Sequence, residues 1–442
     1  MDQNIANANG TRDMIGLDVL IRQKIILILK SMFFNADAVE MDTPVIELKS
    51  IVDQMYGEDF NKLVYELVDH KDGISKQMLR YDLTVPLARY CAMNSIKTLR
   101  RFQIGKVYRR DKPNITNGRY REFFQCDFDI IGSDMGSGIN DIEILDLLVR
   151  ILDKLIGRPN YKIKISNRKL LVDVLVSIGI DPLKIPTICS TIDKLDKLSW
   201  DELVIELESK GMTLDQSLIF REFIILTDGS DQAFDQLLIR ANVDPNVILS
   251  LKKLFNTLRH LGIDNAFEFD LSLARGMDYY TGIIYEAVYL NKSIMASSIA
   301  AGGRYDNMIG QLGNHDNIPA IGLSIGLERI VKIIQETDKH FCIGKTPSVF
   351  VASIGSSDKV INERIKLCSE LRNKGLSVTM SNKTNPKMAA QFDTVFNQNI
   401  KYMVIIGEKE INADEIKIKE ISTRIESTFN RSDGIDFLIN NC

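Results

Sequence analysis

The sequence predicts an α+β domain built on an antiparallel sheet, interrupted by a helical insertion and followed by a smaller α/β domain. Three observations lead to this prediction. Residues 99–131 have the patterning of two strands joined by a turn-rich loop, and residues 166–262 have helical patterning. After residue 345, short strands alternate with helices, which is typical of α/β domains. We therefore expect a first domain over residues 1–335, with the insertion at 166–262, and a second domain over residues 345–442.

The first elements are a helix and an extended segment. Apolar residues recur over residues 17–33 at the spacing of one helical face. Residues 41–46 are expected to be extended, because Pro44 biases Thr43 away from the helical region. The strand pair at 99–131 comes next, and its connecting loop contains a proline and an Asn-Gly pair, both common in turns.

The second strand of this pair alternates between an apolar and a polar face. The residues of the apolar face are Phe124, Cys126, Phe128 and Ile130. Those of the polar face are Arg121, Gln125, Asp127 and Asp129. A polar strand face can simply contact water. Two aspartates on a strand anchored in a core are costly, however, unless a cation or a hydrogen-bond donor pairs with them, so a binding site is the alternative.

The remaining elements follow from periodicity and end signals. In the insertion, one helix should run over residues 167–178 and end at Gly179, and Ser199 to Glu202 should form a capping box. Further expected elements of the first domain are strands at 267–273, 283–289 and 320–326 and a helix at 327–336. Those of the second domain are strands at 349–352, 376–380 and 402–406, a helix ending near Gly375 and a helix at 386–397.

Composition excludes several classes of protein. The 442 residues are 45% apolar and carry a net charge of −4, so a polyanionic partner would need a local basic patch. No apolar run reaches the length of a transmembrane helix, and the N-terminus lacks the features of a signal or transit peptide. Six cysteines without a C-x-x-C pair and four scattered histidines give no basis for a metal site. We expect reduced cysteines, a cytoplasmic location and no protein-ligated metal.

Two groups of residues could bind a ligand. The strand pair carries a dense set of cations suited to phosphate: Arg109, Arg110, Arg119 and Arg121. Residues 273–282 and 301–306 each combine glycines with an arginine and tyrosines, so that backbone could approach a ligand beside a charge. Both segments could also be ordinary turns. A P-loop is excluded, because Lys339 stands where its first glycine would be.

Taken together, these segments resemble class II aminoacyl-tRNA synthetases, and specifically the histidyl-tRNA synthetase family of eukaryotic type. The resemblance extends from Gly10 to the C-terminal domain. The class motifs match at Pro44, at Tyr108–Asp111 with Arg119–Phe123, and at Gly326–Arg329. The runs Leu273–Tyr280 and Ala301–Asp306 are peculiar to the histidyl family.

The resemblance implies a two-step reaction. Histidine and ATP form histidyl-adenylate and pyrophosphate, and the histidyl group then moves to the 3′ end of tRNA(His). The family also implies Mg²⁺ with ATP, an anticodon-binding C-terminal domain and a homodimer.

The resemblance also implies roles for individual residues. Arg109 and Arg275 would clamp the α-phosphate, and Arg329 and Glu122 would complete the ATP site. The residues implied around the imidazole are Asp129, Tyr279, Tyr280 and Tyr305. Those implied around the amino and carboxylate ends are Asp82, Thr84 and Gln125. Many bacterial relatives have Glu at the positions of Asp82 and Asp129.

Two kinds of relative are alternatives. Regulatory subunits of ATP phosphoribosyltransferase and the synthetase-like region of a translational-control kinase share this core without catalysis, but they lose the arginine clamp or the C-terminal domain. Synthetases for glycine or proline share the class motifs but not the Arg275–Tyr280 run.

Overall fold

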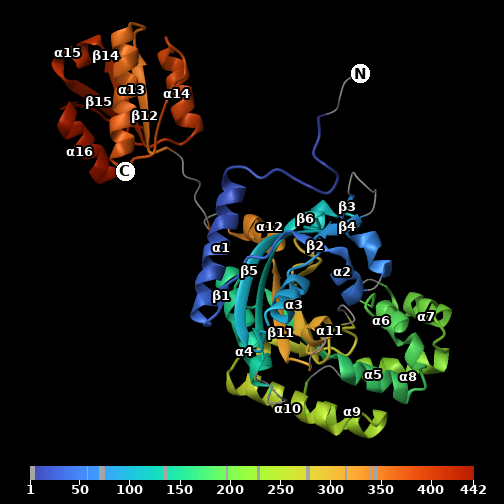
Figure 1. Cartoon of the computed structure of the whole chain (residues 1–442). Coiled ribbons are helices and arrows are strands. Elements are labelled where there is room, and N and C mark those ends of the chain that lie inside the picture. The colour runs from blue at the N-terminus through green and yellow to red at the C-terminus, as the bar shows by residue number, and fades with distance from the viewer. Residues whose placement is uncertain are drawn as a thin grey trace. The chain divides into compact units, whose positions relative to one another are not determined.

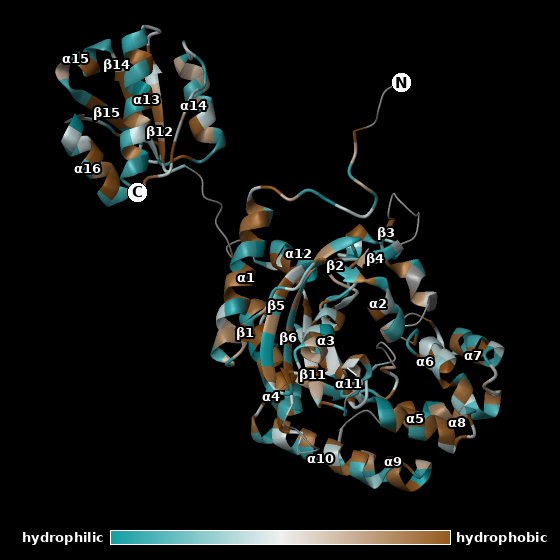
Figure 2. Cartoon of the chain, in the orientation of Figure 1, coloured by the Kyte–Doolittle hydropathy of each residue, from teal (hydrophilic) through white to brown (hydrophobic). Residues whose placement is uncertain are grey.

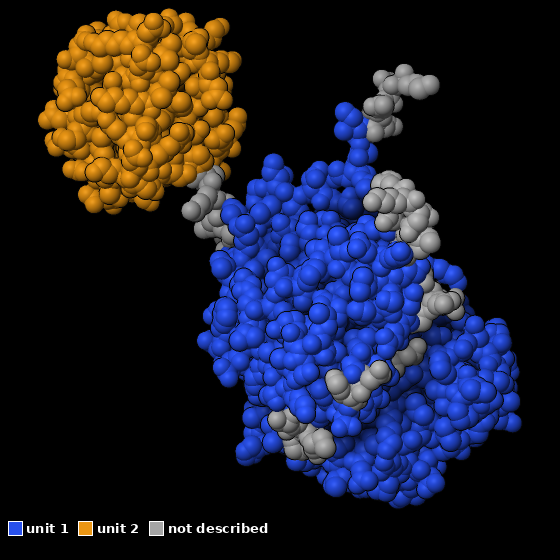
Figure 3. All heavy atoms as spheres, in the orientation of Figure 1, with its two compact units in different colours: residues 1–342 blue, residues 343–442 orange. Residues whose placement is uncertain are grey.

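The computed structural model divides the chain into two compact units, residues 1–342 and 343–442 (Figures 1 and 3). Each unit is considered by itself. The described residues are 5–56, 58–68, 75–132, 138–195, 198–225, 229–274, 279–313, 316–338, 341 and 347–442. Among them, no helix is both long and apolar enough to cross a membrane.

The first unit is built on an eight-stranded sheet with strand order β1-β5-β6-β11-β10-β9-β7-β8. The strands, in that order, are Val39–Glu40, Leu99–Tyr108, Glu122–Ile131, Ala320–Gly326, Ser298–Arg304, Ile283–Tyr289, Tyr161–Asn167 and Phe267–Phe269. The predicted antiparallel sheet is confirmed for the centre, but the edge pairs β1–β5 and β7–β8 are parallel. The predicted strand at 267–273 is also too long, because β8 ends at Phe269.

Helices α1 (Leu17–Asn35), α4 (Ile139–Leu155) and α12 (Leu327–Thr337) share one hydrophobic core with the apolar face of β6 (Figure 1). The ring of Phe33 on α1 lies 5.5 Å from that of Phe128 on β6. The predicted alternation is thereby confirmed for residues 124–130, since Cys126, Phe128 and Ile130 are buried in this core, whereas Arg121 precedes the strand. Asp127 and Asp129 consequently face the other side of the sheet.

That other side is covered by elements that we did not predict. They are α2 (Lys49–Tyr56), α3 (Thr84–Met93), α11 (Met308–Gly313) and a small sheet of β2 (Ile46–Leu48), β4 (Ser75–Leu79) and β3 (Glu66–Val68). They form a second core that includes Tyr305 and Ile131. The segment predicted as extended at 41–46 contributes only Ile46 to a strand, and residues 41–45 form none.

The insertion is helical, as predicted. Its helices are α5 (Arg168–Ser177), α6 (Ile185–Ile192), α7 (Trp200–Ser209), α8 (Leu214–Ile224), α9 (Asp231–Ala241) and α10 (Pro245–His260). Ser199 and Glu202 form the predicted capping box at the start of α7, and Gly179 follows α5 with φ +85°. Hydrophilic and hydrophobic residues mix along these helices in Figure 2, consistent with one buried face each.

The second unit contains a five-stranded sheet with order β13-β12-β14-β15-β16. The three predicted strands are confirmed as β12 (Val349–Ile354), β13 (Val378–Met380) and β14 (Tyr402–Gly407), paired in parallel. The predicted helices correspond to α13 (Asp358–Asn373) and α14 (Met388–Asn397). Our prediction missed the antiparallel strands β15 (Glu415–Glu420) and β16 (Glu426–Asn430) and the helices α15 (Glu408–Ala413) and α16 (Arg431–Asn441).

Candidate active site

A cavity of about 240 Å³, part of it open to solvent, lies on the polar face of β6. Side chains from several segments line it, among them Thr84, Asp127, Asp129, Tyr280, Tyr305 and Ser324. The cavity thus joins the start of α3, strands β6 and β11 and the segment before β9.

Two glycines in neighbouring strands leave room for this cavity. A Cβ atom on Gly322 would lie 2.1 Å from Asp129 Oδ1. On Gly302 it would lie 2.1 Å from the Gly322 carbonyl oxygen and 2.5 Å from the Tyr285 hydroxyl. Contacts this short require the neighbour to move. Any side chain at either position would therefore displace a polar wall of the cavity.

A buried ion pair lies at the cavity, with Asp129 in the lining and Arg101 behind it. Arg101 and Asp129 face each other across the β5–β6 pair, and Arg101 Nη2 lies 2.8 Å from Asp129 Oδ2. The same nitrogen donates to the Leu83 carbonyl at 2.9 Å. Tyr305 donates its hydroxyl proton to Asp129 Oδ1 at 2.5 Å. The carboxylate is thus held between a cation and a phenol, and burial raises its pKa despite both of them.

The start of α3 presents the second acid of the site. Asp82 is buried, and its Oδ1 accepts backbone N–H bonds from Thr84 and Val85, both at 3.1 Å. Its other oxygen accepts the Tyr56 hydroxyl. Because Arg101 also binds the Leu83 carbonyl, this segment is tied to Asp129 on β6.

Tyrosine rings form another wall. The ring centroids of Tyr279 and Tyr280 lie 4.8 Å apart, and Tyr305 meets Tyr279 edge-on at 6.1 Å. Burial raises the pKa of all three hydroxyls, so they are protonated donors at neutral pH.

Gln125 and Asp127 complete the polar strand face. Gln125 Nε2 donates to Ser324 Oγ at 2.9 Å, and Ser324 lines the cavity opposite Asp127 in the β6–β11 pair. Burial, with a smaller contribution from Asp129, raises the pKa of Asp127 to about 7, although Arg101 opposes the shift.

The predicted phosphate-binding arginines lie outside the cavity lining. Arg109 Nε donates to the Tyr81 carbonyl at 3.1 Å, and its guanidinium lies 4.1 Å from the centroid of the Tyr81 ring. Arg329, in the first turn of α12, donates to the Ser298 carbonyl. Glu122 pairs with Lys106 at 2.6 Å. Arg275 lies outside the described residues, so convergence of these arginines stays a prediction.

The hairpin nevertheless contacts both the helix that carries Arg329 and the segment before α3. Its loop packs on the first turn of α12, where a Cβ on Gly118 would lie 3.1 Å from Arg329 Cγ. Lys332 donates to the Thr116 carbonyl in the same loop. Arg109 follows the other strand of the hairpin and contacts Tyr81, three residues before Thr84 of the cavity lining.

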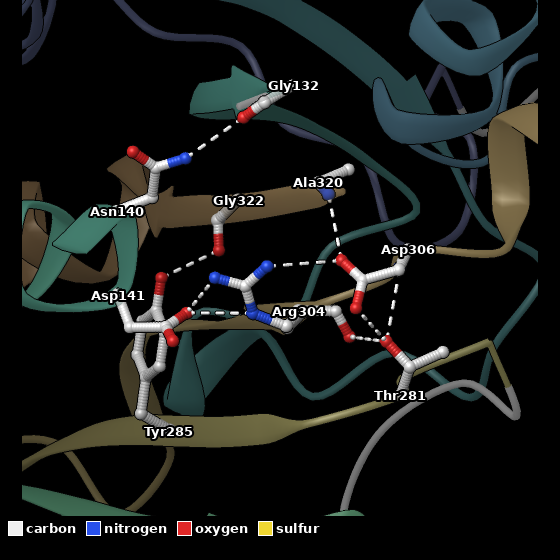
Figure 4. Close-up of polar contacts among 9 residues, drawn as sticks. All are labelled: Gly132, Asn140, Asp141, Thr281, Tyr285, Arg304, Asp306, Ala320 and Gly322. Carbon is white, nitrogen blue, oxygen red and sulfur yellow. Dashed lines mark hydrogen bonds and ion pairs between the residues drawn. The ribbon is translucent and has the colours of Figure 1, made fainter. Parts of the chain in front are cut away.

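The cavity lining includes Ala301, Gly302 and Tyr305 but not Arg304, so the expected approach of backbone to a ligand is consistent with the structure, whereas a charge offered to the ligand is wrong for the segment 301–306. Most of it is strand β10, and the Arg304 guanidinium binds Asp141 Oδ1 at 2.8 Å and Asp306 Oδ1 at 3.2 Å (Figure 4). Asp306 also accepts the Ala320 backbone N–H at 2.9 Å and the Thr281 hydroxyl at 3.1 Å (Figure 4). Arg304 therefore joins β10 to α4 and to the start of β11.

Sequence reasoning missed several positions at or beside the cavity. Arg101 and Ser324 were not singled out, and Asp127 was noticed without a role. Tyr285 was also missed; its hydroxyl donates to the Gly322 carbonyl at 2.6 Å and supports the strand behind the cavity (Figure 4). The available signal was the pairing of β5 with β6, which sets Arg101 opposite Asp129.

The described residues contain no group of three or more His, Cys, Asp or Glu side chains that could hold a metal ion. The donors near the cavity are instead arginines, phenols and backbone amides. Such donors suit a ligand with anionic and hydrogen-bonding groups.

Comparison with known proteins gives concordant matches. Residues 39–330 match the family model for histidyl-tRNA synthetase, and residues 348–441 match the model for an anticodon binding domain. A mitochondrial histidine–tRNA ligase of Bos taurus is 39% identical, covering 97% of this chain and 86% of its own. A cytoplasmic histidine–tRNA ligase of Dictyostelium discoideum is also 39% identical, covering 96% and 88%.

Solved structures share the fold. The histidyl-tRNA synthetase of Nostoc sp. PCC 7120 superimposes with a TM-score of 0.75 at 24% identity, covering 99% of this chain and all of that one. A Bacillus halodurans structure described as an ATP phosphoribosyltransferase regulatory subunit/histidyl-tRNA synthetase gives 0.70 at 18% identity, covering 91% and 98%. The fold alone therefore does not distinguish a synthetase from a regulatory subunit. That distinction comes from the family models and the sequence relatives.

Proposed function

This chain belongs to the histidyl-tRNA synthetase family, and from that premise we propose which residues perform each part of the reaction. The chain is a histidine–tRNA ligase, an aminoacyl-tRNA synthetase that charges tRNA(His) with histidine. The observation that best supports a histidine site is the buried Arg101–Asp129–Tyr305 group, in which Asp129 and Tyr305 line the cavity.

The proposed imidazole site uses hydrogen bonds to select the amino acid. Asp129 would accept a ring N–H, and the protonated Tyr280 would donate to the other nitrogen, with Tyr279 and Tyr305 lining the site. Because Arg101 and Tyr305 already orient the carboxylate, it would need little rearrangement on binding. A competitor without the two nitrogens would leave these buried groups unpaired, which costs about 10⁴-fold or more in selectivity.

The other end of histidine would lie against the start of α3. Asp82, Thr84 and Gln125 are the proposed partners of its amino and carboxylate groups. Thr84 lines the cavity, and Gln125 is bonded to Ser324 of the lining, which supports this orientation.

The proposed ATP site uses arginines to neutralise charge. When the histidine carboxylate attacks the α-phosphate, two anions meet, and fixed cations at that point stabilise the transition state. We assign Arg109 and Arg275 to the α-phosphate and Arg329, with Glu122, to the rest of ATP. Stacking on Tyr81 holds Arg109 in place before substrate arrives.

Mg²⁺ would be bound through ATP itself. The Glu122 carboxylate is paired with Lys106, and the described residues offer no ligand cluster for a metal of their own. The ion would help to neutralise the phosphates, while the arginines position them.

The experiment that tests the function is amino-acid-dependent exchange of labelled pyrophosphate into ATP. Histidine should drive the exchange, and glycine and proline should not, because only histidine satisfies the imidazole site. Exchange driven by glycine or proline would contradict the amino-acid assignment. Absence of exchange with all three would favour a regulatory relative.

Gly322→Ala is expected to raise the KM for histidine about tenfold, because overpacking a tight site costs about 1–3 kcal/mol. The added Cβ would push Asp129 Oδ1 from its position, since the two atoms would otherwise lie 2.1 Å apart. The KM for ATP serves as the internal control and should change less than threefold. An unchanged KM for histidine would show that Asp129 does not contact the substrate.

We also propose partners for two further surfaces. The match of residues 348–441 to an anticodon binding domain supports assigning the second unit to the anticodon of tRNA(His). A homodimer is proposed through the region around Pro44, where Val39, Ile46 and Leu48 are about half exposed. Exposed apolar residues grouped in this way are typical of an interface.

We propose that the enzyme acts in the cytoplasm, as the name of the Dictyostelium relative states for that protein. Other relatives carry mitochondrial names, so fractionation of cells that express the tagged protein would decide between the two compartments.

A further inference from the structure

A short N-terminal segment, residues 8–12, lies against the β5–β6 hairpin. It contains the first residues of the family resemblance, yet none of them has a role in the proposed site. The Gly10 carbonyl accepts the Arg121 backbone N–H at 2.8 Å. Across the hairpin, the Arg121 carbonyl accepts the Arg109 backbone N–H at 2.9 Å. A series of backbone hydrogen bonds therefore connects this segment to Arg109, to which we assign the α-phosphate.

The contact at Gly10 leaves no room for a side chain. Gly10 is buried and has a φ of +81°, in the left-handed region that favours glycine. A Cβ atom there would lie 2.8 Å from Arg121 Cγ and 3.0 Å from Pro113 Cβ. The Arg121 side chain extends the contact, since its Nη1 donates to the Asn9 carbonyl at 3.4 Å and its Nε to the Asp111 carbonyl at 3.3 Å. The Arg121 guanidinium, one of the cations expected to suit phosphate, thus joins the N-terminal segment to the hairpin.

Arg12 makes a second contact with the hairpin and lies near the first turn of α12. Its guanidinium lies 4.5 Å from the centroid of the buried Tyr120 ring in the hairpin. Burial raises the pKa of Glu328 on α12, and the Arg12 charge is one of the groups that oppose this rise. Both Glu328 oxygens in turn accept the Phe124 backbone N–H of β6, at 3.0 and 3.2 Å. Arg12 therefore interacts with the hairpin and with the helical turn that carries Arg329.

We propose that residues 8–12 act as a strap that holds the β5–β6 hairpin in the geometry that binds ATP, with Arg12 as the positioning residue. The inference rests on the proposed assignment of Arg109 and Glu122, on the two arms of this hairpin, to ATP. Arg12 itself would touch neither substrate. It acts by fixing the Tyr120 ring, so that the hairpin needs little ordering when ATP binds. Ordering that accompanies binding weakens affinity, and a prearranged hairpin avoids that cost.

The first test compares the two small substrates in the full-length protein. Arg12→Met keeps a long side chain but removes the charge. It should raise the KM for ATP about 5- to 30-fold, the effect of losing a partly buried cation–π contact, and change the KM for histidine less than threefold. Arg12→Lys keeps a cation over the ring and should stay within threefold of the parent. An unchanged KM for ATP in Arg12→Met, an equal rise for both substrates, or no recovery with lysine would overturn the proposal.

Arg221→Met is the matched control. The Arg221 guanidinium lies 5.1 Å from the centroid of the Trp200 ring in the helical insertion, so this variant removes the same type of contact outside the hairpin. Both KM values should stay within threefold of the parent. A rise in the KM for ATP as large as that of Arg12→Met would show a general loosening of the protein and count against the strap.

Hydrogen exchange of the backbone amides tests the strap without relying on catalysis. The Arg121 amide, which is bonded to the Gly10 carbonyl, should exchange about tenfold faster in Arg12→Met, because the strap opens more often. The amide of Phe128, in the middle of β6, should keep its rate. Unchanged exchange at Arg121 would contradict the proposal.

Failure of the strap and failure of the proposed ATP site give different results. If Arg109→Ala slows histidine activation while Arg12→Met leaves the KM for ATP unchanged, the ATP site stands and only the strap falls. If Arg109→Ala has no effect on activation, the assignment of Arg109 falls. The exchange rate at Arg121 then still decides whether residues 8–12 hold the hairpin.

Discussion

Arg101→Met is expected to lower the free energy of unfolding by about 3–5 kcal/mol, the usual cost of removing one partner from a buried ion pair. Arg101 is fully buried, and its guanidinium lies 2.8 Å from Asp129 and donates to the Leu83 carbonyl. Methionine would fill much of the space of the arginine stem, but it would leave the Asp129 carboxylate in the core without a countercharge. Urea unfolding monitored by circular dichroism would measure the change.

The double variant Arg101→Met/Asp129→Asn tests the mechanism of this loss. It should recover more than half of the lost stability, since the amide carries no charge that needs a partner. Arg100→Ala is the control at the neighbouring residue. The Arg100 guanidinium pairs with Glu143 in a partly exposed position, so this substitution should lower the free energy of unfolding by less than about 1 kcal/mol. A loss below about 1 kcal/mol for Arg101→Met would mean that water or another group solvates Asp129.

The strands and helices with a clear period could be predicted from the sequence. Strand β6 alternates apolar and polar residues from Phe124 to Ile130, and that alternation assigned Asp127 and Asp129 to the face that carries the cavity. The capping box at Ser199 was also predictable, because both of its hydrogen bonds lie within one helical turn. Local signals of this kind need no knowledge of distant contacts.

Strand β10 shows why other elements could not be predicted. Its sequence contains two consecutive glycines, which disfavour strands and usually indicate turns. Gly302 and Gly303 are accommodated in the strand because residues of β9, β11 and the Tyr280 segment come too close for a side chain. That requirement becomes visible only when the neighbouring strands are in place.

The prediction of the candidate site from the sequence was incomplete for a similar reason. Arg101 looks in the sequence like one more cation in a run with Arg100, but the pairing of β5 with β6 buries it opposite Asp129. Arg304, conversely, was expected to offer its charge to a ligand, but in the fold it binds Asp141 of α4. Charge in a sequence indicates that a partner is needed, whereas the tertiary contacts decide whether that partner is protein or ligand.

Replacing Arg109 or Arg275 with alanine is expected to slow histidine activation about 10²- to 10³-fold, the cost of removing one preorganised charge from a transition state. For Arg109, the structure supplies the reason for preorganisation. Its guanidinium lies against Tyr81 and Phe123, and its Nε donates to the Tyr81 carbonyl. Single-turnover formation of histidyl-adenylate, with histidine and ATP saturating, would measure the rate of the chemical step.

The two variants distinguish a charge clamp from a structural role. If both arginines act on the α-phosphate, the kcat of each variant should fall by a much larger factor than the KM for histidine changes. The reason is that the charge these arginines stabilise develops after histidine has bound. Arg150→Ala is the matched control, since that arginine forms an exposed pair with Asp146 on α4 and should change the rate less than threefold. A rate within threefold of the parent for Arg109→Ala would assign its guanidinium to packing on Tyr81. The α-phosphate would then have to be neutralised by other cations of the site.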